Sequence, residues 1–411
     1  MNRNVNTENS RAYRAHTDII LILLVAVMSI MGIVAVCVAT YTPDSSSDIP
    51  FLNHVVESSY TLRQCLFVMI APLVVGFILI IPYDLLFRRA ELIYWAMAIF
   101  LSLVTIFNRA QGVKAWLDII WGYTIQPSEF AKLSMILILA KQLSRSNKPM
   151  GDFQSLARIL FTVLFPCIII LAEGETGSML VIVFLSAVMM YFAGVSLKIL
   201  GGLGGIAALG ILSVYGFMVA TGSDDYRLAR ISGFLNPELY SSSDAYQILQ
   251  SQMAIGSGGL TGIGMFVDGS MSQLNYVPAD WTDFIYATIG EAWGFAGCMT
   301  VLVLYILILL RMLYLAWFTR DKFGRLIICG VIGMLLFHVF ENVAMTLGLM
   351  PITGIPLPFL SYGGSNMVTN MGGIGLVLNV TRNRSLSDAV STPQTFYNPY
   401  RFSTRFKTRA Y

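Results

Sequence analysis

The chain has 411 residues, of which 56% are hydrophobic and only 12% are charged, and its mean hydropathy is +0.70. A soluble globular domain carries about 25% charged residues, so this composition excludes that class and indicates a membrane protein. The net charge of +3 follows from membrane topology and does not indicate nucleic-acid binding.

Ten apolar runs long enough to cross a bilayer follow one another along the chain. Because a segment in lipid must satisfy its own backbone hydrogen bonds, each run is predicted to be a helix. The expected fold is therefore an all-α integral membrane protein with about ten transmembrane helices. The predicted spans are 18–40, 64–81, 90–107, 127–143, 157–172, 177–193, 198–221, 284–310, 326–349 and 363–380.

Basic residues predict the orientation of these spans. If the N-terminus is cytoplasmic, the cytoplasmic segments hold most of the Arg and Lys residues. The outer segments then hold Arg63, Arg109, Lys114, Arg227 and Arg230. The positive-inside rule therefore places both termini in the cytoplasm.

Three parts follow from this topology. Residues 1–17 form a polar cytoplasmic segment, and 18–380 form one membrane domain. Within that domain, a large extracytoplasmic loop at 222–283 joins the seventh and eighth spans. The tail, 381–411, is basic and contains aromatic residues, so we expect it to lie against anionic head groups of the cytoplasmic leaflet.

The second outer loop contains Lys114 and Trp116, and the fourth span starts with Ser128, Glu129 and Lys132. Glu129 and Lys132 are three residues apart and therefore share one helix face. Charged groups inside a membrane usually face the bundle interior or a wet cavity. A structural ion pair and a contact with substrate both remain open for this pair.

The glycine cluster at 201–205 lies within the seventh span. It lacks the Lys and Ser/Thr of a phosphate-binding loop. It is therefore predicted to allow close packing against another helix.

Two arginines stand near the start of the large outer loop. Arg227 and Arg230 share a face if this stretch is helical. Guanidinium groups bind phosphate oxygens in a two-pronged fork, which suits a lipid-linked diphosphate. Ordinary pairing with Asp224 or Asp225 is the alternative.

Thr282 and Asp283 stand at the head of the eighth span, where water meets lipid. One interpretation is that either side chain caps the helix N-terminus. The other is that Asp283 is a general base at the membrane surface. Glu291 lies eight residues further along, about 12 Å away on a helix, and is expected to line the cavity.

The ninth span contains His338 and Glu341, three residues apart. No third ligand is evident, so interhelical hydrogen bonds are predicted and a metal site is not. The connection at 348–365 contains three prolines and cannot be regular helix. Irregular backbone at this depth must lie against protein or a wet cavity. Ser361 in this connection either supports the cavity or contacts the substrate.

Several of these segments resemble the motifs of one family. Residues 126–132 read Gln–Pro–Ser–Glu–Phe–Ala–Lys, residues 282–286 read Thr–Asp–Phe–Ile–Tyr, and 348–365 is the strongest match. Together they resemble the shape, elongation, division and sporulation (SEDS) family of membrane glycosyltransferases, typified by RodA and FtsW. Residues 273–278 are more similar to the RodA members than to the FtsW members.

The chain departs from the family pattern at several positions, among them Asn366, where a Ser is usual. Ala115 stands where an Arg is usual, which leaves Lys114 as the local cation. Glu175 stands in place of an Asp, Ala279 in place of a Glu, and Trp281 in place of a His. These departures indicate a divergent or specialised member.

The resemblance implies a peptidoglycan glycosyltransferase that polymerises lipid II at the outer face of the membrane and releases undecaprenyl diphosphate, for cell shape or division. It implies that Asp283 is catalytic. Thr282, next to it, is expected to orient the Asp283 carboxylate and to bind the substrate. The other residues expected to bind lipid II or the undecaprenyl-linked glycan are Lys114, Trp116, Ser128, Glu129, Lys132, Arg227, Arg230 and Ser361.

The resemblance also implies a partner, a class B penicillin-binding protein that supplies transpeptidation. No cofactor is certain. A divalent cation, Mg²⁺ or Mn²⁺, near Asp283 is compatible with the resemblance, although the sequence shows no ligand cluster for one.

Two other functions remain open. A flippase or transporter of lipid-linked cell-wall precursors would also have many spans and an intramembrane ion pair. Against this function, no internal repeat is evident, and the polar motifs gather on one face. The weaker alternative is a scaffold that only recruits a partner.

Overall fold

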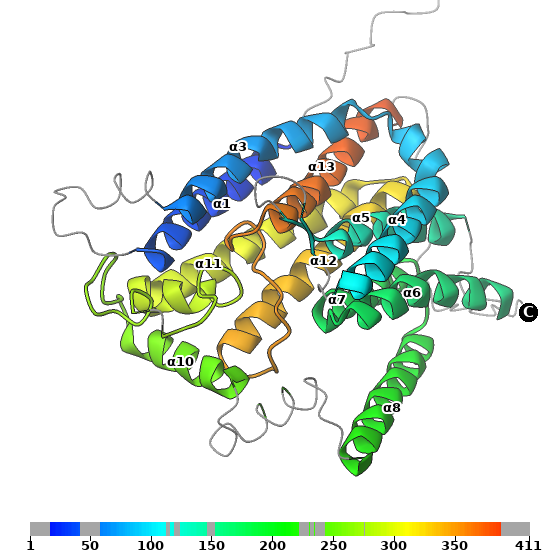
Figure 1. Ribbon diagram of the computed structural model, residues 1–411. Coiled ribbons are helices and arrows are strands. Elements are labelled where there is room, and N and C mark those ends of the chain that lie inside the picture. The colour runs from blue at the N-terminus through cyan, green and yellow to red at the C-terminus, as the bar shows by residue number, and fades with distance from the viewer. Residues whose placement is uncertain are drawn as a thin grey trace, which may run out of the picture.

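The computed structural model describes residues 17–41, 58–111, 116–118, 124–145, 153–221, 230, 234, 243–274 and 276–387. Each of the ten predicted spans coincides with a helix, which confirms the all-α membrane fold (Figure 1). These helices are α1 (Ile19–Ala39), α3 (Ser59–Ile80), α4 (Tyr83–Gln111), α5 (Pro127–Ser144), α6 (Phe153–Glu173), α7 (Thr176–Phe192), α8 (Leu197–Thr221), α11 (Ile285–Phe318), α12 (Lys322–Thr346) and α13 (Gly364–Ser387).

Two smaller features complete the described elements. Helix α10 (Ser243–Ser257) lies in the large loop between α8 and α11. Strands β1 (Leu117–Asp118) and β2 (Thr124–Ile125) form a short antiparallel pair before α5. Helix α13 continues to Ser387, past the predicted boundary at 380, because a helix can extend beyond the apolar run that crosses the lipid. Residues 1–16 and 388–411 of the predicted terminal segments lie outside the described residues.

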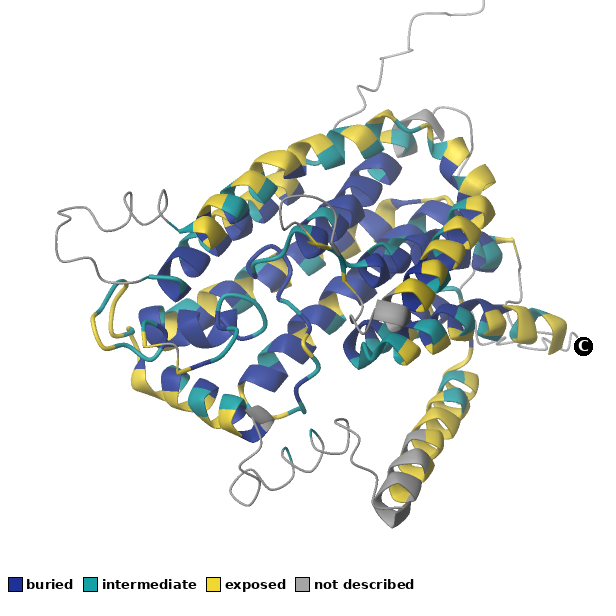
Figure 2. Ribbon diagram, viewed as in Figure 1, coloured by how far each residue is buried: buried dark blue, intermediate teal, exposed yellow. Residues whose placement is uncertain are grey.

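Helices α5, α12 and α13 form the centre of the bundle, where buried residues predominate (Figure 2). Helices at the periphery of the bundle, such as α3, expose large apolar side chains, among them Met69, Leu73 and Phe77. This pattern is expected where lipid is the surrounding solvent. Six of the described helices are long and apolar enough by themselves to cross a bilayer. The charged residues of α5 are accommodated because protein surrounds that helix.

The helix ends gather on two opposite sides of the bundle. At one side Arg311 on α11 forms an ion pair with Asp18, the N-cap of α1, at 2.6 Å. At the same side Asn379, near the end of α13, donates to the carbonyl oxygens of Ile78 and Ile81 at 2.7 and 2.9 Å. We call this side the basic end. The starts of α5, α7, α11 and α13 lie at the opposite side, which we call the site end.

Helix α11 is bent at Gly294, whose φ of 64° and ψ of −160° are not helical. The N–H of Phe295 donates to the carbonyl of Gly259 at 2.9 Å, so the bend binds part of the large loop. A Cβ at Gly294 would lie 2.3 Å from the nitrogen of Gly262, which excludes any side chain there.

Glu291 also binds this loop, so the prediction that it lines the cavity is wrong. Its carboxylate accepts hydrogen bonds from the N–H of Met271 at 2.6 Å and from the N–H and hydroxyl of Ser272 at 3.0 and 2.6 Å. The carboxylate therefore satisfies backbone donors of the large loop. Residue spacing along the helix could not reveal a partner 20 residues away.

The glycine cluster at 201–205 does not pack closely against a helix in this structure, contrary to the prediction. Helix α8 extends away from the bundle (Figure 1) and packs sparsely against α7. A Cβ built at Gly201, Gly202, Gly204 or Gly205 would have no neighbouring heavy atom within 4 Å. The small residues leave this face of α8 open.

Candidate functional site

Neither Thr282 nor Asp283 caps α11. The helix begins at Ile285, and its N-cap position, Phe284, makes no side-chain capping bond. The Thr282 hydroxyl donates to the carbonyl of Ala279 at 3.2 Å and not to the Asp283 carboxylate, so the prediction that Thr282 orients Asp283 is wrong. The Asp283 carboxylate makes no hydrogen bond within the described part of the chain, so the capping interpretation is wrong. The carboxylate is left available for chemistry.

The proline-rich connection between α12 and α13 holds the backbone around Asp283. The Asn342 amide donates to the carbonyls of Asp283 and Ile355 at 2.7 and 2.8 Å. The buried Ser361 hydroxyl donates to the carbonyl of Thr282 at 2.6 Å. These contacts fix the turn by its main chain and leave the carboxylate unbound.

A second pair of contacts fixes the same turn from the side of Trp281. The N–H of Tyr362 donates to the carbonyl of Trp281 at 2.9 Å. The Trp281 ring stacks on Tyr60, with ring centroids 5.2 Å apart, and Tyr60 packs edge-on against Tyr362 at 5.3 Å. The residue that replaces the usual His therefore belongs to an aromatic cluster that supports the turn.

Asp283 lines a polar cavity of about 320 Å³ at the site end. Its wall combines the turn before α11, the start of α7, the segment before α5 and the α12–α13 connection. A Cβ at Gly354 would lie 3.5 Å from the Asp283 carboxylate. The lining residues are Trp116, Gln126, Gly174, Glu175, Gly177, Ser178, Arg230, Thr282, Asp283, Thr353, Gly354, Pro356, Tyr362, Gly363, Ser365 and Asn366.

The surroundings of Asp283 make its carboxylate a stronger base than an exposed one. Burial raises the pKa of Asp283 to about 6, and the positive charge of Arg230 opposes part of this rise. A base with a pKa near the working pH is suited to accept a proton from a hydroxyl group.

Asp280 does not supply a second charged group at neutral pH. Burial, with a smaller contribution from the charge of Glu291, raises the pKa of Asp280 to about 8, and both carboxylate oxygens lack a hydrogen-bond partner among the described residues. Asp280 also does not line the cavity. It therefore does not replace the carboxylate that the family usually carries at the position of Ala279.

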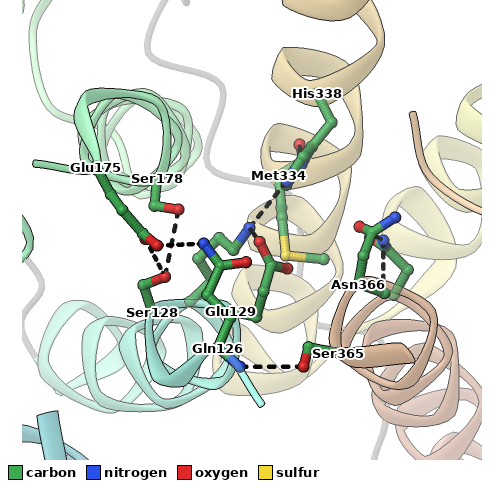
Figure 3. A network of polar contacts seen from close by, with 11 residues as sticks. Gln126, Ser128, Glu129, Glu175, Ser178, Met334, His338, Ser365 and Asn366 are labelled. Atoms are coloured by element: carbon green, nitrogen blue, oxygen red, sulfur yellow. Dashed lines mark hydrogen bonds and ion pairs between the residues drawn. The ribbon is translucent and has the colours of Figure 1, made fainter. Parts of the chain in front are cut away.

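A polar network, drawn in Figure 3, forms another part of the wall of the cavity. Glu175, at the N-cap position of α7, accepts hydrogen bonds from the Gln126 amide and the Ser128 hydroxyl. The Gln126 backbone N–H donates to the Ser365 hydroxyl at 3.1 Å. Burial raises the pKa of Glu175, and the bonds from Ser128 and Gln126 oppose that rise. The network joins α5, α7 and α13 at the cavity.

Behind this wall lies the intramembrane ion pair. The Lys132 ammonium is 2.6 Å from the Glu129 carboxylate and 2.9 Å from Nε2 of His338. Because Nδ1 of His338 donates to the carbonyl of Met334 at 2.7 Å, its Nε2 accepts the hydrogen bond from Lys132. This bond confirms the predicted interhelical role of His338, since it joins α12 to α5.

An apolar groove of about 470 Å³ adjoins the polar cavity. It runs between α3, α5 and α13 beside the β1–β2 pair. Its lining residues are Phe67, Ile70, Trp116, Thr124, Ile125, Phe130, Thr282, Tyr362, Gly363, Gly364, Ser365 and Val368. Five of these also line the polar cavity: Trp116, Thr282, Tyr362, Gly363 and Ser365. One continuous site therefore offers a polar and an apolar compartment.

The structure separates the predicted site residues into three groups. Trp116, Arg230, Thr282 and Asp283 line the cavity. Ser128, Glu129, Lys132 and Ser361 are buried behind its wall, and their contact with substrate stays a prediction. Lys114 and Arg227 lie outside the described residues.

The sequence predictions assigned no site role to Gln126, Tyr362, Ser365 or Asn366, which also line the cavity. Their position within or next to the family motifs was the signal that could have found them.

The cavity offers few side chains that could bind a divalent cation. The described residues contain no group of three or more His, Cys, Asp or Glu side chains that could hold a metal ion. Among them, the carboxylates that line the cavity are those of Glu175 and Asp283. Mg²⁺ commonly uses one or two carboxylates together with water and substrate phosphates. Asp283 fits a cation held in that way, shared with a phosphorylated substrate.

Comparisons with known proteins agree with this architecture. Residues 18–386 match the FtsW/RodA/SpoVE family, described as cell cycle proteins. The peptidoglycan glycosyltransferase MrdB of Escherichia coli (strain K12) is 33% identical over 283 residues, covering 68% of this chain and 74% of the relative. Stage V sporulation protein E of Bacillus subtilis (strain 168) is 32% identical over 370 residues, covering 89% and 97%.

Two solved structures are also similar. One, from a peptidoglycan synthase complex that coordinates polymerization and crosslinking, has a TM-score of 0.71 at 28% identity and covers 90% of this chain and 98% of that chain. The rod shape determining protein RodA of Thermus thermophilus has a TM-score of 0.63 at 27% identity, covering 90% and 97%. These findings confirm the SEDS resemblance. The chain belongs to the FtsW/RodA/SpoVE family.

Proposed function

We propose that this chain is a peptidoglycan glycosyltransferase that polymerises lipid II into glycan strands at the outer face of the cytoplasmic membrane. Relatives from Escherichia coli and Treponema pallidum carry the name peptidoglycan glycosyltransferase. The observation that carries the proposal is the Asp283 carboxylate, which makes no hydrogen bond within the described residues and opens into a polar cavity beside an apolar groove.

Asp283 is the general base in this proposal. Its carboxylate accepts the proton of an acceptor glycan hydroxyl while that oxygen attacks the anomeric carbon of the donor sugar. The bond from the anomeric carbon to the diphosphate oxygen breaks, and undecaprenyl diphosphate leaves with the electron pair. The proton on Asp283 then passes to water or to the leaving group.

The two compartments suit the two parts of a lipid-linked sugar. Arg230 lines the polar cavity and supplies positive charge against the charge that develops on the departing diphosphate. Lys114 and Arg227 are proposed to add to this charge. The apolar groove accommodates the polyprenyl chain. Trp116 and Thr282 line both compartments and mark their junction.

Orientation and partner complete the proposal. The basic end faces the cytoplasm under the positive-inside rule, which predicts Asp283 at the outer face and both termini inside.

One of the similar solved structures comes from a synthase complex that coordinates polymerization with crosslinking. We therefore expect a class B penicillin-binding protein to bind this chain.

If a Mg²⁺ or Mn²⁺ ion binds at this site, Asp283 is the residue that would hold it, and the ion would supply positive charge against the departing diphosphate. Chelation tests this part of the proposal. EDTA should lower polymerisation, and added Mg²⁺ or Mn²⁺ should restore it. Full activity in EDTA would remove the cation from the proposal and leave the role of Asp283 unaffected.

The central experiment compares purified wild-type protein with Asp283→Asn on lipid II. The variant keeps the shape of the side chain but cannot accept the proton, so glycan polymer should be absent. Asp268→Asn is the matched control, because Asp268 is exposed in the same loop and does not line the cavity. Polymer at the wild-type rate from Asp283→Asn would refute the catalytic assignment.

The alternative function is a flippase for lipid-linked precursors. The buried Glu129, Lys132 and His338 are the kind of intramembrane polar group found in transporters. Vesicles that contain fluorescent lipid II distinguish the two functions. Polymer growth without lipid II crossing supports the enzyme, and crossing without polymer supports the flippase.

A further inference from the structure

A second large cavity lies at the basic end of the bundle, between α4, α5 and α6. Its volume is about 490 Å³. Gln126, next to the first residue of α5, lines the Asp283 cavity, and Arg145, just past its last residue, lines this one. The 18 residues of α5 span about 27 Å, close to the ~30 Å thickness of the hydrocarbon core. The two cavities therefore lie at opposite membrane surfaces.

The polar part of this cavity carries excess positive charge. Glu91 is 3.1 Å from the Lys141 ammonium and 3.6 Å from the Arg145 guanidinium, so two cations share one carboxylate. Arg158, on the opposite wall from α6, is exposed, and no ion pair with it is found among the described residues. Among the described residues that line the cavity, two cations, Arg145 and Arg158, therefore face one carboxylate. Lys141 does not line the cavity, but its ion pair offsets the charge of Glu91, so the cavity favours an anionic ligand.

The part of the same cavity that faces the lipid is lined by aromatic side chains. Trp95 on α4 and Phe161 on α6 line it and are 44% and 54% exposed on the lipid-facing side of the bundle. Phe165 completes the cluster, with ring centroids 5.8 Å from Trp95 and 5.7 Å from Phe161. Trp rings at this depth are typical of the boundary between head groups and acyl chains.

The floor of the cavity is held in place before any ligand arrives. The Tyr94 hydroxyl donates to the carbonyl of Thr162 at 2.9 Å. The Gln142 amide donates to the hydroxyl of Thr162 at 2.9 Å. These bonds tie α4 and α5 to α6. They therefore fix the relative positions of the helices that carry the arginine and aromatic lining residues of the cavity.

From this arrangement we propose that the cavity binds an anionic glycerophospholipid of the cytoplasmic leaflet. Arg145 and Arg158 bind the phosphate diester, and its acyl chains lie over Trp95 and Phe161. Basic cavities between membrane helices on this side of a bilayer are suited to such head groups. The site is separate from the Asp283 cavity and does not depend on the proposed reaction.

Native mass spectrometry of the purified full-length protein tests the proposal, with phosphatidylglycerol, phosphatidylcholine of the same chains, and inorganic phosphate as probes. One molecule of phosphatidylglycerol should bind tightly. Phosphatidylcholine should bind much more weakly, because its choline cation offsets the charge of the same phosphate diester and is repelled by the arginines. Arg145→Gln/Arg158→Gln should weaken phosphatidylglycerol binding about 25-fold, since each basic group contributes about fivefold at an anionic surface. Arg88→Gln/Arg89→Gln is the control, because it removes the same charge from the same end outside the cavity.

Trp95→Ala/Phe161→Ala provides a second variant, which retains both arginines and should weaken phosphatidylglycerol binding by removing the contact with the chains. Equal binding of the two lipids would overturn the proposal, as would equal losses in the two arginine double variants. Displacement of phosphatidylglycerol by inorganic phosphate would identify a site for a free anion and would overturn the assignment to a lipid.

Discussion

The hydroxyl of Ser361 donates a 2.6 Å hydrogen bond to the carbonyl oxygen of Thr282, and thereby joins the α12–α13 connection to the residue before the proposed base. The same hydroxyl accepts a bond from the N–H of Leu357 at 2.7 Å. Ser361 therefore acts on Asp283 through the backbone, as a positioning residue.

Ser361→Ala should lower the polymerisation rate about tenfold, because losing this positioning bond costs about 1 to 1.5 kcal/mol. The rate should fall with little change in the KM for lipid II, since Ser361 does not line the cavity. Steady-state kinetics on lipid II measure both. A raised KM with an unchanged kcat would instead assign Ser361 a direct contact with substrate.

The rate of polymerisation should fall as the pH drops through about 6. Burial raises the pKa of Asp283 to about 6, so below that pH the carboxyl is protonated and cannot accept a proton. The expected decrease is about tenfold per pH unit. Initial rates between pH 5 and 8 would measure it.

The variant Arg230→Gln tests whether the fall in rate at low pH comes from protonation of Asp283. Arg230 lowers the pKa of Asp283, so its removal should move the fall in rate to higher pH. A pH profile that stays flat down to about pH 4.5 in the wild-type protein would contradict the assignment of Asp283 as base.

Lys132→Met should destabilise the protein by about 3 to 5 kcal/mol, because it leaves the Glu129 carboxylate buried without its cation. Glu129→Gln/Lys132→Met removes both charges and should recover most of that loss. Thermal unfolding in detergent gives the stabilities.

The double variant also decides the role of the ion pair in the reaction. If the pair only joins α5 to α12, the folded double variant should polymerise lipid II at a rate near that of the wild type. If the double variant is stable but inactive, the pair contacts the substrate, as the family motif implies.

Gly294→Ala should destabilise the bend of α11 by at least about 1 to 3 kcal/mol, the cost of an unfavourable backbone conformation. The added Cβ would also meet the nitrogen of Gly262 at 2.3 Å. Gly202→Ala is the control, because a Cβ there meets nothing within 4 Å. Equal unfolding temperatures for the two variants would show that the bend is not tightly packed.

The spans could be predicted from the sequence because lipid imposes a single demand, a long apolar helix, at every crossing. The place of Asp283 at the head of α11 was predicted for the same reason. The partners of buried polar groups were not. Lys132 and His338 are 206 residues apart, and Glu291 binds backbone groups that no periodicity marks. Local patterns locate such residues but do not identify what they contact.

The bend at Gly294 and the carboxylate of Glu291 fasten the large loop to α11 within about three turns of Asp283. The first turns of α11 and this loop therefore form one rigid unit. A protein that binds this loop would therefore act on the turn that carries Asp283 and, through Asn342 and Ser361, on α12 and the α12–α13 connection.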